Sequence, residues 1–166
     1  MRYFAKLVAA VLLSASAVSG GALAAEPQAD PWLSLRRFVG DWTGTATGNA
    51  GGGTVARTYM FVMNERFIHE TNTSRYPPSE KNRSGEVHEH VGFFSYDKTL
   101  KVVVLRQFHI EGFVNTYRQA PTSQNPAVLV FDSESFENFS NLWKARETYE
   151  FLSEDEFIET FELAPP

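Results

Sequence analysis

The fold is decided by residues 86–109, which read EVHEHVGFFSYDKTLKVVVLRQFH. Two runs rich in Val, Phe and Tyr flank Asp97-Lys98, and short runs of this composition on either side of a tight turn are typical of a β-hairpin. The pair at 97–98 predicts a two-residue turn, with Tyr96 opposite Thr99. We therefore expect this stretch to form two antiparallel strands.

The same pattern extends along the chain in both directions. Short runs rich in β-branched and aromatic residues alternate with clusters of Gly, Asn, Asp, Ser and Pro. The predicted strands are 41–48, 54–64, 67–75, 86–96, 99–109, 113–119, 127–133, 145–152 and 156–163. Because most connections have hairpin length and no helix separates the strands, the sequence predicts an all-β, antiparallel up-and-down meander barrel of nine to ten strands. Residues 32–39 predict a short N-terminal helix that ends at Gly40, and whether a further closing strand lies beyond this chain is left open.

The N-terminus has the order of a secretory signal. Arg2 and Lys6 precede an apolar run over 7–18, which is followed by small residues up to Ala24. We expect a signal peptide at 1–24, a linker at 25–31 and a single β-barrel domain at 32–166. The predicted location is therefore exported, either periplasmic or secreted, with no membrane insertion after cleavage.

Composition narrows the classes of partner. The chain has no cysteine, a net charge of -5 and a sequence pI near 5.4. A nucleic-acid partner would call for a basic stripe, so we expect none. Small molecules and proteins remain as candidate partners, and the oligomeric state is left open.

The predicted hairpin register suggests one candidate site. It places Glu89 opposite Arg106 on a largely apolar face that we expect to point inward, together with Phe108. Such a pair could orient a bound polar ligand, or it could be a solvated pair at the barrel mouth. Both interpretations stay open.

Three of the four histidines share the opposite face of this hairpin. His88, His90 and His109 could supply three nitrogens to a metal and leave one coordination position open. Under the predicted register this face points to solvent, where histidines are ordinary. The alternative of a plain surface cluster therefore stands beside the metal site.

Two segments resemble known barrels. The run Gly40-Asp41-Trp42-Thr43-Gly44 resembles the first strand of the calycins, the lipocalins and fatty-acid-binding proteins. The run over 87–93, VHEHVGF, is similar to the Met-His-x-Glu-x-Gly-Phe segment of nitrobindins, and Glu111-Gly112-Phe113-Val114 is similar to the strand that follows there. This likeness covers about residues 35–117.

The nitrobindin resemblance implies a ten-stranded barrel that binds ferric haem, reacts with nitric oxide and isomerises peroxynitrite. It would place His88 near the open face of the ligand. Val87 replaces the Met of that motif and His90 replaces its second acidic position. The haem-ligating histidine of the last nitrobindin strand has no counterpart here, so no haem ligand is assigned and the cofactor is unknown, with haem as one candidate.

The leading interpretation is an exported carrier that holds a small hydrophobic molecule in a barrel cavity, with no catalytic residues assigned. A nitrobindin-like haem- or metal-dependent enzyme and a protein-interaction module without a ligand are the alternatives. Whether the chain is an enzyme stays open, although binding is favoured. The candidate ligand-binding residues are Trp42, His88, Glu89, His90, Arg106, Phe108, His109, Phe113 and Tyr117.

Overall fold

The computed structural model describes residues 30–48, 51–80, 82–121 and 125–166. The predicted signal peptide, and the predicted linker up to residue 29, lie outside the described residues. Nine antiparallel strands form one sheet in chain order. They are β1 (Gly40–Gly48), β2 (Gly51–Val62), β3 (Phe67–Tyr76), β4 (Glu86–Asp97), β5 (Val102–His109), β6 (Val114–Gln119), β7 (Val128–Glu137), β8 (Lys144–Phe151) and β9 (Phe157–Ala164).

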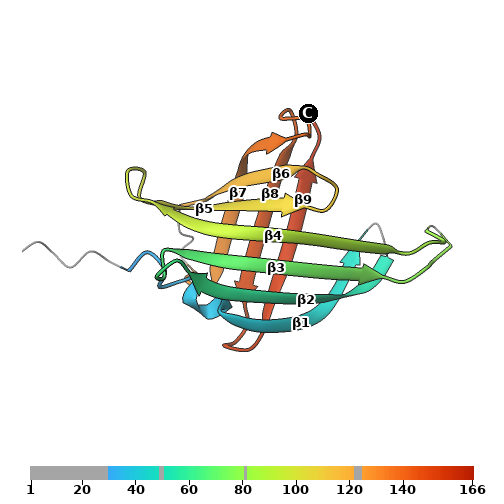
Figure 1. The fold of residues 1–166 in the computed structure, drawn as a ribbon, viewed down its shortest axis with the longest axis horizontal. Helices are drawn as coiled ribbons and strands as arrows, with labels where there is room; N and C mark the ends of the chain where they lie inside the picture. Colours follow the sequence, from blue (N-terminus) through green and yellow to red (C-terminus); the bar gives the residue numbers. More distant parts are fainter. Residues whose placement is uncertain (1–29, 49–50, 81, 122–124) are drawn as a thin grey trace, which may run out of the picture.

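The sheet curls into a half-barrel. In Figure 1, β1 to β4 run across the view, while β7 to β9 cross them steeply. The strand order begins at β1 and ends at β9, so these two strands form the edges of the sheet. The predicted all-β up-and-down meander is confirmed, and the predicted strand bounds differ from the observed ones by a few residues.

The segment before β1 is not the helix that the sequence suggested. It forms turns and a single 3-10 turn, η1 (Arg36–Phe38). Trp32, Leu35 and Phe38 are buried and recur every third residue, which matches the three-residue period of a 3-10 turn. The segment thus buries one side and passes directly into the sheet.

Phe38 fills one end of the half-barrel. It is fully buried, and its ring packs against aromatic rings from five other positions at centroid distances of 4.9 to 6.0 Å. These neighbours are Tyr59, Phe94, Tyr149, Phe151 and Phe157. The apolar core is therefore concentrated at the end of the sheet where η1 lies.

The turn between β4 and β5 is longer than predicted. Asp97 pairs with Val102, so four residues form the loop. The Asp97 carboxylate accepts hydrogen bonds from the backbone N–H groups of Thr99 and Leu100, at 2.8 and 2.9 Å, and Lys101 adopts a φ of 55°. These local bonds favour the wider loop over a two-residue turn.

The longer loop changes the cross-strand partners. Arg106 lies opposite Phe93, and the predicted pairing of Glu89 with Arg106 is wrong. Glu89 instead accepts a hydrogen bond from Thr73 at 3.4 Å, and Arg106 donates to Ser95 at 3.2 Å.

The predicted inward face of this hairpin is also wrong. Glu89, Arg106 and Phe108 are exposed on the convex face, whereas Phe94 and Leu105 on the opposite face are fully buried. Both faces carry large apolar residues, so composition alone did not separate them. The three histidines of the hairpin therefore point toward the interior.

No helix in the described part of the chain is long and apolar enough to cross a membrane.

We expect Phe38→Ala to lower the free energy of unfolding by about 3–5 kcal/mol, because it leaves a cavity among aromatic rings. Urea unfolding followed by tryptophan fluorescence measures the loss. Leu33→Ala is the matched control, since Leu33 lies in the same segment and is 74% exposed. An equal loss in both variants would contradict the proposed role of Phe38.

Candidate functional site

Polar side chains line the concave face in two adjacent rows that cross the strands. One row runs Tyr59, Glu70, Gly92, Gln107 and Asn115 from β2 to β6. The next row runs Arg57, Asn72, His90 and His109 from β2 to β5. Cross-strand neighbours on one face of a sheet lie about 5 Å apart, so these side chains form a continuous polar lining.

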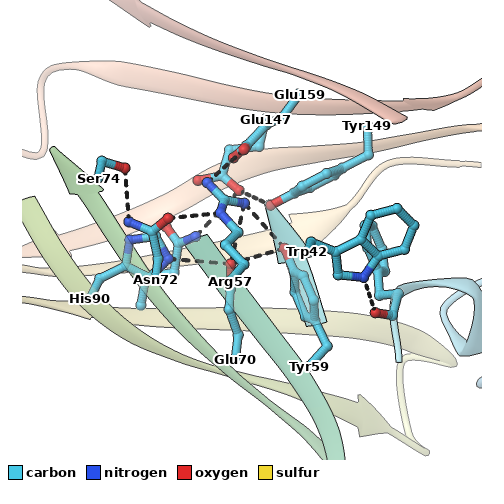
Figure 2. A network of polar contacts seen from close by, with 12 residues as sticks. Trp42, Arg57, Tyr59, Glu70, Asn72, Ser74, His90, Glu147, Tyr149 and Glu159 are labelled. Carbon is cyan, nitrogen blue, oxygen red and sulfur yellow. Dashed lines mark hydrogen bonds and ion pairs between the residues drawn. The ribbon is translucent and has the colours of Figure 1, made fainter. Parts of the chain in front are cut away.

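Arg57 is the centre of this lining (Figure 2). Its guanidinium lies 2.6 Å from Glu159 of β9 and 3.4 Å from Glu70 of β3, and it donates to Asn72 at 2.9 Å. The side chain of Arg57 is only 10% exposed and that of Glu70 is fully buried. The ion pairs therefore connect β2 both to its neighbour and to the far edge of the sheet.

The two carboxylate oxygens of Glu70 differ in their hydrogen-bond partners. Its Oε1 atom receives the Tyr59 hydroxyl at 3.1 Å, and it lies 3.3 Å from Nε2 of His90. Its Oε2 atom has no hydrogen-bond partner among the described residues and lies over Gly92. Burial acts to raise the pKa of Glu70, but the hydrogen bond with His90 and the charge of Arg57 hold it below its ordinary value.

A second buried carboxylate lies on β8. Glu147 accepts a hydrogen bond from the Tyr149 hydroxyl at 2.5 Å and one from Gln107 at 3.4 Å. Burial, together with the charges of Glu159 and Glu70, raises the pKa of Glu147 to about 8. Glu147 is thus protonated in the folded protein at neutral pH.

The three hairpin histidines meet at the end of these rows. His90 and His109 are direct cross-strand partners, and His88 lies two residues from His90 on the same face. One ligand nitrogen from each ring lies within 4.8 Å of the others. Phe113 stacks on His109 at a centroid distance of 4.3 Å and shields that side of the cluster.

Each of these histidines also has a polar partner on its other side. Nδ1 of His88 lies 2.7 Å from Glu111, and Nε2 of His109 lies 3.2 Å from the side-chain nitrogen of Asn115. Nε2 of His90 faces Glu70. Burial, followed by the neighbouring His90 and His88 rings, lowers the pKa of His109 to about 4, so its ring is neutral at physiological pH.

Four buried polar atoms of the interior have no hydrogen-bond partner within the described residues. They are Glu70 Oε2, His90 Nδ1, Gln107 Oε1 and Asn115 Oδ1. A fifth such atom, Arg118 Nε, belongs to a side chain on the convex face. An unpartnered buried polar group lowers the stability of a folded protein by about 1–3 kcal/mol. Four such groups lie in two adjacent rows of this interior.

The remaining predicted site residues lie in different parts of the structure. Tyr117 is fully buried and faces the interior, where it accepts a hydrogen bond from Asn115 at 2.9 Å. Trp42 lies at the aromatic end, with its indole N–H bonded to the Phe38 carbonyl at 2.6 Å. Phe113 covers the histidine cluster, and Glu89, Arg106 and Phe108 lie outside the half-barrel.

Sequence reasoning missed the charged and amide residues of the interior, which are Arg57, Glu70, Gln107, Asn115 and Glu147. Each alternates with outward-facing neighbours and lies on the same face as a buried aromatic or aliphatic residue two positions away. Tyr149, for example, follows Glu147 at this spacing. A charged residue in phase with the apolar face of a strand was the available signal.

Two surface hollows lie on the sheet. One of about 590 Å³ is lined by Thr43, Gly44, Thr54, Val55, Ala56, Thr73 and Arg75. The other, of about 380 Å³, lies over β3 to β5, and its lining includes Asn72, His90 and His109 of the interior as well as Glu89 and Phe108. Most of their lining side chains point outward, so neither is an apolar cavity inside the half-barrel.

No protein-family model matches the chain, and no curated protein matches it. The assignment of function therefore depends on the geometry described above.

We expect Gly92→Ala to destabilise the protein by about 1–3 kcal/mol, because a Cβ at this position would lie 2.5 Å from Glu70 Oε2 and displace the carboxylate. Gly44→Ala is the matched control, since a Cβ there meets nothing within 4 Å. Urea unfolding of both variants measures the difference. Equal stability of the two variants would show that Glu70 moves without loss.

Glu147 should make the stability of the protein depend on pH. Its pKa rises from an ordinary 4.5 to about 8 on folding, so its contribution is complete below about pH 4.5 and is lost as pH rises toward 8. Glu147→Gln keeps the shape and the acceptor oxygen but cannot titrate.

We expect the wild type to lose about 2 kcal/mol more than Glu147→Gln between pH about 5.5 and about 7.5. Urea unfolding of both proteins at the two pH values gives this difference directly, and groups that titrate in both proteins cancel. Parallel pH profiles would mean that Glu147 is ionised in the folded state.

Proposed function

We propose that this is an exported binding protein whose polar interior takes one small cation or one small molecule rich in hydrogen-bond donors. The observation that carries the proposal is the set of four unpartnered buried atoms: Glu70 Oε2, His90 Nδ1, Gln107 Oε1 and Asn115 Oδ1. The residues that bear them are each at least nine-tenths buried. A ligand would supply the partners that the fold itself leaves out.

The chemistry of these atoms indicates the class of ligand. The carboxylate and amide oxygens offer lone pairs, and so does Nδ1 of His90 when its Nε2–H is donated to Glu70. Four unpartnered acceptor atoms in one interior favour a cation or a hydrogen-bond donor over an anion. The overall net charge of -5 favours the same class of ligand.

The hydrophobic ligand of the leading sequence interpretation receives less support. The apolar end of the interior is filled by Phe38 and its aromatic neighbours, and charged and amide groups line two adjacent rows of the concave face. A long apolar molecule would have to displace the aromatic rings or bury itself against unpaired polar groups, and either costs free energy. The proposed ligand is therefore polar.

The proposal is tested by a native mass spectrum of protein purified gently from the exported fraction of its cells, compared with the mass under denaturing conditions. We expect one bound adduct in the wild type. In Asn115→Leu, which removes an interior acceptor at nearly constant size, the adduct should fall to a small fraction of the wild-type occupancy.

Thr116→Val is the matched control, because Thr116 is the next residue of β6 and faces outward. It should keep the adduct at wild-type occupancy. Far-UV circular dichroism confirms that both variants are folded. A bare wild-type protein that also gains no thermal stability from metal ions, polyols or organic amines would contradict the proposed function.

A further inference from the structure

We propose that the ligand is a single divalent transition-metal ion of the zinc class, held by His88, His90 and His109. This inference rests on the proposed function, because it names the ligand of the same interior.

The spacing of the ring nitrogens suits one ion. Nε2 of His88 and Nδ1 of His109 lie 3.2 Å apart. Two nitrogens that each lie about 2.0–2.1 Å from zinc, at a tetrahedral angle, stand roughly 3.3–3.4 Å apart. The observed distance therefore needs only a small adjustment for both atoms to bind the same metal.

The third nitrogen is buried and unpartnered. Nδ1 of His90 has no hydrogen-bond partner among the described residues, and the side chain of His90 is only 5% exposed. The ligand nitrogens of all three rings lie within 4.8 Å of one another. A metal at this position would turn the unpartnered nitrogen into a ligand atom.

The outer nitrogens are held in the manner of metal-bound histidines. His88 contacts the Glu111 carboxylate at 2.7 Å, and His90 contacts the Glu70 carboxylate at 3.3 Å. A carboxylate that accepts the remote N–H fixes the tautomer and the orientation of a ligating imidazole and increases its basicity. The nitrogen left free in His88 faces His109, and the one left free in His90 is the unpartnered Nδ1.

Asn115 gives His109 the same support after a single adjustment. The side-chain nitrogen of Asn115 lies 3.2 Å from Nε2 of His109, while its Oδ1 has no partner. Exchange of the amide nitrogen and oxygen lets Oδ1 accept Nε2–H of His109, which leaves Nδ1 of that ring free for a metal. The exchange places the amide nitrogen at the buried position that has no partner among the described residues, so the number of unpartnered atoms stays the same.

The donor set also narrows the choice of ion. Three neutral imidazoles suit zinc, copper, nickel and cobalt, whereas calcium and magnesium require oxygen ligands. Three protein nitrogens complete three positions of a tetrahedral ion and leave the fourth to water or to a small anion. The site therefore binds the metal without closing its coordination shell.

The first test is titration of the metal-free full-length protein, stripped with a chelator, with Zn²⁺ by isothermal calorimetry. A parallel titration with Co²⁺ reports tetrahedral coordination by its visible absorption. We expect one equivalent of metal to bind. His90→Ala and His109→Ala should each lose most of this binding, and His69→Ala should retain it, because His69 lies on the convex face opposite Phe93.

Glu111→Gln provides a variant whose fold is not in question, since the Glu111 side chain is 43% exposed. It keeps all three ligands and removes only the carboxylate behind His88, so we expect metal affinity to fall by about 10–100-fold. A plain surface role for Glu111 would leave the affinity unchanged.

The inference is overturned if the wild type binds none of Zn²⁺, Co²⁺, Cu²⁺ or Ni²⁺, or if His109→Ala binds as tightly as the wild type. This failure differs from failure of the proposed function. An organic adduct in the native mass spectrum, without metal binding, would overturn the metal ion and leave the binding function standing. Absence of both adduct and metal would overturn both.

Discussion

The buried charge of Arg57 is the constraint on which the rest of the interior depends. An unpaired guanidinium inside a protein costs several kcal/mol, so it must be surrounded by acceptors. Glu159 reaches it from β9, and Glu70 and Asn72 reach it from β3 (Figure 2). Because β2 and β9 are far apart in the strand order, their ion pair spans the concave face and favours the curl of the open sheet.

Tyrosines form the boundary between the two halves of the interior. The rings of Tyr59 and Tyr149 both pack on Phe38, at centroid distances of 5.0 Å, while their hydroxyls donate to Glu70 and Glu147. A tyrosine can serve both environments because its ring is apolar and its tip is polar. The aromatic packing thus offsets the desolvation of the carboxylates that it adjoins, and the polar rows can lie inside a stable sheet.

The strands could be predicted from the sequence because each run of β-branched and aromatic residues ends at a turn signal. The faces of β4 and β5 could not, because Val91 and Phe93 on one face compete with Phe94 on the other. The Asp97 side chain decided the register, because it accepts hydrogen bonds from two backbone N–H groups and widens the loop. The three histidines were recognised as a group, but their inward orientation follows only once Phe94 and Leu105 are known to be in the core.

Glu70 ties the histidine cluster to the fold. Its Oε1 atom lies within hydrogen-bonding or ion-pairing distance of Tyr59, Arg57 and His90, so the group that neutralises the buried guanidinium also orients an imidazole. Glycine at position 92 leaves room for this carboxylate, because a Cβ there would contact Glu70. The orientation of His90 is therefore set by a carboxylate that also neutralises Arg57, so the contacts that stabilise the curled sheet and those that position the histidine share one group.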